Sequence, residues 1–462
     1  MIGRLAVRSL TAHPVRSGVL AAGFGVGVSV MAILLGVAEI VLSQARAPAL
    51  VGGGDVLIQL DTSVPARMLI SGTLQADALR DRVEVAAPWH AADLFLVGED
   101  GSVTPVEARG GIPSLERALG DPETMGVPGW EDTEADLTWR DSTPTEVLRQ
   151  IDRFHPVPDA PAWGDSWAEW LYFNGRAGDE RFYLTFLVGS VLDDGRRPAG
   201  VRLQLAGPAG VENFSATATL TQADVDRAPE LTIGGSTIEL RGLEYHVHLD
   251  LLAPDGRRAE GDLVLEASPG RLLPPLQVAG ALGWRTGYVV PVMSGVLDGA
   301  VQVDGRAPVS FAGGRGYHDH NWGFWERVSW QWGQVQDGDY SLLYGRVFPP
   351  PEAADPDRIP GFIGALGPDG PLGWASNVLI SEENGADGEP DRITIRGRSR
   401  SIDITMRFST RSSVRTRMEQ GPLPAGLDFL QLQGEYVVTG EAGDRLFDFT
   451  APGSAETFRQ IE

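Results

Sequence analysis

One stretch of the chain, residues 313–325, gathers the residue types that could do chemistry. It reads Gly-Gly-Arg-Gly-Tyr-His-Asp-His-Asn-Trp-Gly-Phe-Trp, and it holds two of the seven histidines and two of the twelve tryptophans. Carboxyl, imidazole and amide groups beside large rings are typical of an apolar ligand pocket with a few placed polar groups. A second interpretation is a hydrogen-bonded corner that closes a β-barrel, and the two are compatible.

Two His-x-His pairs raise the question of a metal. In an extended strand, His246 and His248 share one face, and so do His318 and His320. Four imidazoles could therefore meet at one ion. No further ligand with metal-site spacing accompanies them, so we predict no metal and no cofactor, which elemental analysis of the purified protein would check.

Composition excludes several function classes. The formal net charge of −24 argues against nucleic acid as a partner, because nucleic acids select basic surfaces. There is no cysteine, which excludes thiol nucleophiles and cysteine-ligated metals. There is also no lysine, which excludes Schiff-base chemistry and a P-loop lysine.

The N-terminal segment predicts a membrane anchor. Residues 18–42 form an almost unbroken apolar run, long enough to cross a bilayer as a helix. Arg4, Arg8 and Arg16 precede it, so the positive-inside rule orients the bulk of the chain outside the cytoplasmic membrane as a single-pass protein. A cleaved signal peptide is the alternative, with an Ala-x-Ala site at residues 45–47, although Pro48 would follow the cut.

The same region resembles the start of an ABC-transporter permease of the lipoprotein-export type, over residues 5–17 and 47–55. A permease needs further spans, and the most apolar later run, residues 287–297, is too short. We therefore predict an anchor at residues 1–50, with ABC transporter subunits as candidate partners. Residues 51–164 follow as a mixed, acidic and proline-rich strap.

From residue 165 the pattern indicates an all-β fold. Apolar and polar residues alternate over many short segments, as in antiparallel sheets with one buried face. Asp-Gly pairs at residues 304–305, 337–338 and 369–370 predict tight hairpin turns. Two runs of strands predict two tandem barrels, at residues 165–285 and 286–462, each able to hold one small apolar ligand.

Two motifs carry a family resemblance over about residues 165–460. They are Glu-Trp-Leu-Tyr-Phe-Asn-Gly at residues 169–175 and Gly-Tyr-His-Asp-His-Asn-Trp-Gly at residues 316–323. With these motifs the chain resembles the tandem lipocalin-like family that includes carotenoid 1,2-hydratases (hydroxyneurosporene synthases) and certain fungal Diels–Alderases. The resemblance implies two lipocalin-like barrels and a long apolar ligand, such as an isoprenoid, a carotenoid or another lipid.

The resemblance also implies catalytic positions. In the family's hydratases, a His-x-Trp pair and a later Tyr are linked to activity, and the matching residues here are His320, Trp322 and Tyr344. An acidic residue two positions after that Tyr is replaced by Arg346, which departs from the hydratase pattern.

Hydration of a C=C bond needs an acid near the alkene, a pocket that tolerates a cation and a positioned water. We predict that Asp319 or His320 supplies the proton, because burial in an apolar pocket keeps a carboxyl protonated to higher pH. Trp322 would face the carbocation, and Tyr344 or Tyr317 would orient the water. The remaining predicted ligand-binding residues are Tyr317, His318, Asn321, Trp325, Trp170, Tyr172, His246 and His248.

Two functions thus remain open at this point. The first is a membrane-anchored lipocalin-like protein that binds a long apolar molecule, alongside an ABC export system. The alternative is a hydro-lyase resembling carotenoid 1,2-hydratase, which adds water to an isoprenoid by acid catalysis. A scaffold for a transporter is a third, weaker interpretation, and mass spectrometry of bound lipids separates the three.

Overall fold

The computed structural model describes residues 15, 56, 58, 70, 82–97, 103–120, 129–140, 143–268, 271–368, 370–386, 388–418 and 427–460. The chain divides into two compact units, one containing residues 85–138 and the other residues 139–462. No helix within the described residues is long and apolar enough to span a membrane. The predicted anchor at residues 18–42 lies outside the described residues.

The first unit holds part of the predicted strap. Strands β1 (Trp89–Val97) and β2 (Val103–Gly111) form an antiparallel hairpin. They are followed by the short helices α5 (Pro113–Ala118) and α6 (Glu134–Arg140). Local hydrogen bonds join the helical part, including one of 2.7 Å from the Ser114 backbone N–H to Asp132 Oδ1.

The second unit begins with helix α7 (Pro144–Ile151) and a ring-like antiparallel sheet. Eight strands follow one another around the ring, and its last contact is a single residue pair between β6 and β9. Strands β7, β8, β11 and β13 extend its edges, with short helices α8 (Gln222–Val225), η1 (Gly164–Ser166) and η2 (Ala281–Gly283) in the connections. In ring order the strands are β3 (Trp167–Ala177), β4 (Glu180–Val188), β5 (Arg197–Gly207), β6 (Gly210–Leu220), β9 (Glu244–Leu252), β10 (Arg258–Glu266), β12 (Arg285–Val303) and β14 (Gly314–Phe324). The edge strands are β7 (Leu231–Ile233), β8 (Ser236–Arg241), β11 (Leu273–Ala279) and β13 (Val309–Ser310).

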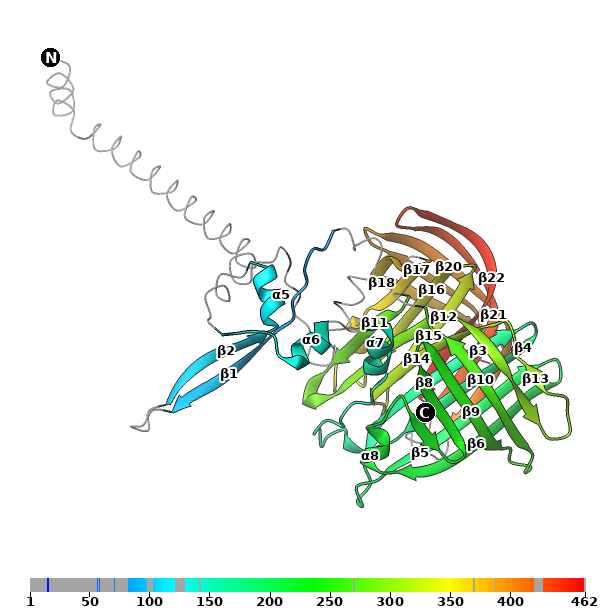
Figure 1. Cartoon of the computed structure of the whole chain (residues 1–462). Helices are drawn as coiled ribbons and strands as arrows, with labels where there is room; N and C mark the ends of the chain where they lie inside the picture. The colour runs from blue at the N-terminus through cyan, green and yellow to red at the C-terminus, as the bar shows by residue number, and fades with distance from the viewer. Residues whose placement is uncertain are drawn as a thin grey trace, which may run out of the picture. The chain divides into compact units, whose positions relative to one another are not determined.

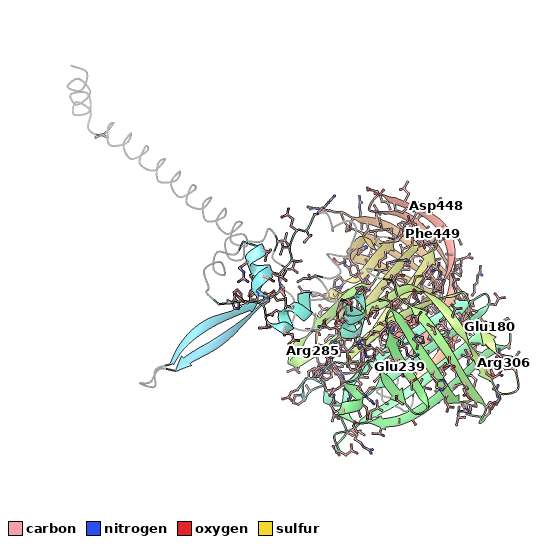
Figure 2. All side chains as sticks on the ribbon, viewed as in Figure 1. Glu180, Glu239, Arg285, Arg306, Asp448 and Phe449 are labelled. Atoms are coloured by element: carbon pink, nitrogen blue, oxygen red, sulfur yellow. The ribbon has the colours of Figure 1, made fainter. Side chains whose placement is uncertain are left out.

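The rest of the chain forms a closed eight-stranded antiparallel barrel, drawn from yellow to red in Figure 1. Each strand pairs with the next in sequence, and β22 closes the barrel on β15. Its strands are β15 (Ser329–Asp337), β16 (Tyr340–Phe348), β17 (Gly361–Gly367), β18 (Gly370–Asn384), β19 (Pro390–Arg398), β20 (Ile402–Met418), β21 (Leu427–Ala442) and β22 (Arg445–Gln460), with η3 (Pro356–Arg358) after β16. Figure 2 shows Glu239 and Arg306 on the ring-like sheet and Asp448 and Phe449 on the closed barrel.

The prediction of a mostly β fold is confirmed, with one closed barrel and one ring-like sheet in place of two equivalent barrels. Asp-Gly turns form where predicted, with positive φ at Gly305 and Gly338. The prediction placed the second barrel from residue 286. Strand β12 instead pairs with β10, and β14 pairs with β3, so both belong to the ring-like sheet. The chain passes from this sheet to the closed barrel between Phe324 and Ser329.

Side chains fill the interior of the ring and the interior of the closed barrel. In the closed barrel the inward residues of successive strands form one buried core, which includes Leu342, Ile363, Ile395, Met406 and Phe408. The sequence analysis expected the ligand inside such a barrel. The pocket lined by the 313–325 segment lies instead between the two sheets, where the outer face of the ring meets β15, β21 and β22.

Candidate functional site

Strand alternation divides the 313–325 segment between two environments. In β14, His318, His320 and Trp322 point into the ring, whereas Tyr317 and Asp319 point out of it toward the closed barrel. The direction of the first set follows from their partners, which include a side chain of β9 on the far wall of the ring. The segment therefore contributes to a network inside the ring and to a pocket outside it.

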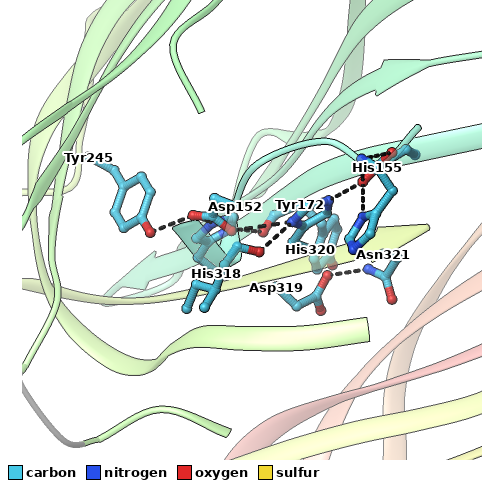
Figure 3. Close-up of polar contacts among 10 residues, drawn as sticks. Asp152, His155, Tyr172, Tyr245, His318, Asp319, His320 and Asn321 are labelled. Atoms are coloured by element: carbon cyan, nitrogen blue, oxygen red, sulfur yellow. Dashed lines mark hydrogen bonds and ion pairs between the residues drawn. The ribbon is translucent and has the colours of Figure 1, made fainter. Parts of the chain in front are cut away.

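The inner set is a network of two carboxylates and three imidazoles, Asp152, Glu169, His155, His318 and His320, which we call the histidine network (Figure 3). His318 Nε2 lies 3.0 Å from Asp152 Oδ2, and His320 Nε2 lies 2.8 Å from Glu169 Oε1. The same Glu169 oxygen lies 2.7 Å from His155 Nδ1. Both β14 histidines are fully buried.

Helix α7 delivers Asp152 to this network. A capping box of Thr143 and Glu146 starts the helix, and its apolar face buries Val147, Leu148 and Ile151. His320 Nδ1 lies 3.1 Å from the Ile151 carbonyl oxygen, so the imidazole meets the negative end of the helix. Tyr245 of β9 donates a 2.5 Å hydrogen bond to Asp152 from the opposite wall. The network thus ties the end of α7 to three strands.

The carboxylates and imidazoles of the histidine network stabilise each other's charged forms. Burial acts against the carboxylate of Asp152, but the charge of His318 and hydrogen bonds from His318 and His320 hold its pKa below the usual range. Burial also acts against the carboxylate of Glu169, and His155 and His320 lower its pKa. For His320, burial opposes protonation, yet Asp152 and Glu169 raise its pKa to about 9. A protonated His320 between two carboxylates is therefore the resting state at neutral pH.

The histidine network also contains the ligand types of a metal site. Ligand atoms of His155, Glu169 and His320 lie within 4.8 Å of one another. Two imidazoles and one carboxylate suit zinc or iron. In this structure Glu169 Oε1 already lies at hydrogen-bond distance from both imidazoles, which satisfies the three groups without an ion.

The outer face of β14 lines a pocket between the ring and the closed barrel, which we call the aromatic pocket. It has a volume of about 80 Å³, enough for several water molecules or the end of a larger ligand. Aromatic rings dominate its wall, and the only carboxyl groups that the described part of the chain contributes are those of Asp319 and Glu456, which we call the carboxyl pair. The lining residues are Trp170, Tyr172, Thr185, Leu187, Tyr288, Asp319, Asn321, Trp325, Trp330, Trp332, Val347, Phe429, Glu456 and Phe458.

Hydrogen bonds hold the carboxyl pair in place. Asn321 Nδ2 donates to Asp319 Oδ1 over 2.6 Å, and the Tyr317 hydroxyl hydrogen-bonds the same carboxyl. Trp332 Nε1 donates to the Tyr317 hydroxyl over 3.1 Å. The Tyr172 hydroxyl donates a short hydrogen bond to Glu456 Oε1. Side chains from β3, β14, β15 and β22 are therefore joined across the pocket.

The pocket favours neutral carboxyl groups. Burial and the nearby charge of Glu456 raise the pKa of Asp319 well above its usual range. Burial raises the pKa of Glu456 to about 7, against the effect of hydrogen bonds from Tyr172 and Gln431. A protonated carboxyl in an aromatic pocket can donate a hydrogen bond to a ligand oxygen or a proton to a reacting carbon.

The predicted site residues fall into three groups. Trp170, Tyr172, Asp319, Asn321 and Trp325 line the aromatic pocket, with Tyr317 hydrogen-bonded behind Asp319.

His318, His320 and Trp322 belong to the ring interior, where Trp322 stacks on His155 at 4.2 Å between ring centroids.

The third group lies apart from both places. Tyr344 is buried in the core of the closed barrel, where its hydroxyl is hydrogen-bonded to that of Tyr436. His246 pairs with Glu244 and His248 with Asp262 on the outer surface of β9 and β10. The four histidines of the two His-x-His pairs therefore do not meet.

Sequence reasoning missed Asp152, His155, Glu169 and Glu456 as site residues. Glu169 carried a signal, because it is a lone acidic residue in the apolar run of residues 167–173. Asp152 and His155 sit in the strap, and Asp152 is 166 positions from its partner His318. Glu456 alternates with small and apolar residues in β22, and nothing local indicates that its face is covered.

Comparisons with known proteins give a structural likeness only. No family model matches the chain, and no curated protein matches it. The structure is similar to that of CghA with Sch210972, with a TM-score of 0.38 and 12% sequence identity over 70% of this chain and 96% of CghA. A porin-like protein from Bacteroides uniformis has a TM-score of 0.12 and 8% identity over 63% of this chain and 95% of its own.

Proposed function

We propose that this protein binds an apolar small molecule in the aromatic pocket between its two β-sheets. The observation that carries the proposal is the wall of the pocket, where aromatic side chains of five strands surround two buried carboxyl groups. Ligand sites commonly lie at such interfaces, with apolar walls and a few polar groups that orient the ligand. The motif resemblance to lipocalin-like proteins that handle isoprenoids points to the same ligand class.

The carboxyl pair gives the pocket its polar end. Burial raises the pKa of Asp319 well above its usual range, which favours its neutral form, and raises the pKa of Glu456 to about 7, so Glu456 is near its midpoint at neutral pH. Neutral carboxyl groups are compatible with an apolar ligand, whereas two carboxylates would strongly disfavour one. A hydroxyl or carbonyl group of the ligand would accept their hydrogen bonds.

Ligand identification tests the proposal. The protein is purified under native conditions and extracted with organic solvent, and the extract is analysed by mass spectrometry for a stoichiometric apolar compound. Trp330→Ala removes one wall of the pocket and should reduce the amount bound about ten-fold or more. Phe449→Ala removes a partly buried aromatic residue of β22 outside the pocket and serves as the control. Retention of the compound by Trp330→Ala at the control's level would reject this site.

A second function, acid-catalysed hydration of an isoprenoid double bond, is favoured by the setting of Asp319. Its carboxyl faces an aromatic wall that can stabilise a carbocation. In this mechanism Asp319 donates a proton to one alkene carbon, water attacks the other, and the added water then returns a proton to the Asp319 carboxylate. His320 and Trp322 point into the ring, so Asp319 is the acid and Trp330 or Trp332 faces the cation.

Product analysis separates the enzyme from the binding protein. Incubation with an acyclic isoprenoid should give an alcohol with the wild-type chain and none with Asp319→Asn, which keeps the shape but loses the acid. Binding of the same isoprenoid should survive in Asp319→Asn. No alcohol from the wild-type chain would leave binding as the function, and equal product from both chains would reject Asp319 as the acid.

Membrane attachment through residues 18–42 and an association with ABC transporter subunits are further proposals, supported by the sequence alone. Cell fractionation of the full chain and of a chain that starts at residue 52 tests the first. Co-purification of transporter subunits with the full chain tests the second. Recovery of both chains in the same fraction would remove the anchor from the proposal.

A further inference from the structure

Three arginines lie side by side on the outer face of the ring-like sheet. Arg176 of β3 is directly opposite Arg315 of β14 on one side and Arg181 of β4 on the other. We call these three residues the arginine row. None of them forms an ion pair with a carboxylate among the described residues.

Such a row is unfavourable for the protein by itself. Like charges directly opposite one another on neighbouring strands destabilise a sheet. Burial and the neighbouring Arg181 lower the pKa of Arg176. The chain has 62 acidic residues against 38 basic ones, so carboxylates are abundant in composition, yet none of those that the structure describes forms an ion pair with this row. An anion from outside the chain would remove the repulsion.

The arginine row lines a cavity of about 50 Å³ between the ring and the closed barrel. Neutral hydrogen-bonding side chains complete the wall, including Asn174, Gln334 and Ser454. Gln334 Nε2 donates to Asn174 Oδ1 over 3.1 Å, which joins β15 to β3 in the wall of the cavity. Among the residues that the structure describes, no aspartate or glutamate lines this cavity.

This cavity adjoins the aromatic pocket along the strands. On β3, Tyr172 lines the aromatic pocket and Asn174 lines the arginine cavity. On β15 the corresponding residues are Trp332 and Gln334. Residues two apart on a strand face the same side and are about 7 Å apart. The two cavities are thus neighbouring parts of one interface, one apolar and one positively charged.

We propose that the arginine row binds the anionic group, a phosphate or a carboxylate, of the same molecule whose apolar part occupies the aromatic pocket. This inference rests on the proposed function and names its ligand class as an anionic amphiphile. Guanidinium groups suit this role because their planar donors bind phosphate and carboxylate oxygens in pairs.

The test compares hexadecyl phosphate, hexadecanol and inorganic phosphate as probes of the full chain, with affinities measured by quenching of tryptophan fluorescence and by calorimetry. The wild type should bind hexadecyl phosphate about ten-fold or more tightly than hexadecanol. Arg176→Gln and Arg181→Gln should each lower the affinity for hexadecyl phosphate about ten-fold and leave the affinity for hexadecanol unchanged. Arg396→Gln, an exposed strand position on the closed barrel, is the matched control for the loss of one positive charge.

Each outcome decides between the proposals. Equal affinity for hexadecyl phosphate and hexadecanol, or an equal loss in the Arg396→Gln control, overturns the anionic subsite and leaves the apolar pocket standing. Inorganic phosphate could instead bind as tightly as hexadecyl phosphate and lose affinity in the same arginine variants. That result would overturn the link between the arginine row and the aromatic pocket, and would indicate a site for a free anion. Binding of none of the three probes overturns both the subsite and the proposed function.

Discussion

Asp319 and His320 are adjacent in the chain but act on opposite sides of β14. The Asp319 carboxyl lines the aromatic pocket, whereas His320 Nε2 lies 2.8 Å from Glu169 inside the ring. Alternation of side chains along a strand makes this separation unavoidable. The two interpretations of residues 313–325, a ligand pocket and a hydrogen-bonded corner, therefore correspond to two faces of one strand. Substitutions on the two faces should have different effects.

Loss of a carboxylate inside the ring should destabilise the fold. Glu169→Gln leaves the fully buried His320 and the partly buried His155 without their shared anion, and breaking a buried pair such as Glu169–His320 costs about 3–5 kcal/mol. Urea unfolding followed by circular dichroism measures the change. Asp262→Asn is the matched control, because it breaks a carboxylate–histidine pair at the surface and should cost about 1 kcal/mol or less. Similar losses in both variants would contradict a structural role for the histidine network.

The histidine network should also make stability depend on pH. The pKa of His320 is raised to about 9 from an ordinary value of 6.5, so the folded state binds its proton more tightly than the unfolded state. The contribution of protonated His320 to the free energy of unfolding is fully present below about pH 6.5 and is lost as the pH rises through about 9. The shift corresponds to about 3 kcal/mol.

Urea midpoints measured between about pH 6 and pH 10 test this expectation. His320→Gln should flatten the decline in that range, whereas His248→Gln, at the surface of β9, should leave it unchanged. A wild-type curve without a decline through about pH 9 would show that His320 is not held as the cation.

The fold could be predicted to the level of strands and turns because these depend on local pattern. Alternation and Asp-Gly pairs located the hairpins, including the turns at Gly305 and Gly338. The assignment of β12 to the second barrel failed because its apolar run and length suit either sheet. Its true neighbours, β10 and β14, are set by pairing in space, which no single segment encodes.

The site was predictable only in part for the same reason. The 313–325 segment supplied Asp319, Asn321 and the histidines, but the prediction assigned Asp319, His320 and Trp322 to one pocket instead of to two faces of a strand. The partners of each face come from distant segments, since Asp152 lies 166 positions before His318. Glu456, whose pocket partner Tyr172 lies 284 positions away, belongs to the last strand. Long-range pairing of this kind leaves no signal in composition or spacing.

Binding in the aromatic pocket should weaken as the pH rises. Burial raises the pKa of Glu456 to about 7, so its carboxyl is neutral at lower pH and becomes charged above that value. A carboxylate in an aromatic pocket disfavours an apolar ligand and no longer donates a hydrogen bond. The affinity for hexadecanol, measured by tryptophan quenching from about pH 5 to about pH 9, should fall about ten-fold across the range.

A neutral side chain at the same position isolates the cause. Glu456→Gln should bind at all pH values nearly as the wild type does at low pH, with the transition removed. Glu435→Gln, at a partly exposed position of β21 paired with Arg411, should keep the wild-type transition. The role of Glu456 would be rejected by a transition of unchanged size and midpoint in Glu456→Gln.

The arginine row should cost stability in the absence of an anion. Arg176 faces Arg315 and Arg181 across two strand pairs, and relief of like-charge contacts of this kind contributes roughly 0.2–1 kcal/mol. Arg176→Gln should therefore raise the free energy of unfolding at low salt, and added salt should shrink the gain by screening the repulsion.

Urea unfolding at about 10 mM and about 500 mM sodium chloride measures both effects, since the screening length falls several-fold between them. Arg396→Gln should change stability by less than about 0.5 kcal/mol at either salt concentration, as is usual at exposed positions. Hexadecyl phosphate should reverse the order of stability, because it binds the wild-type row and neutralises it. A loss of stability in Arg176→Gln without ligand would mean that the packing of the Arg176 side chain outweighs the repulsion within the row.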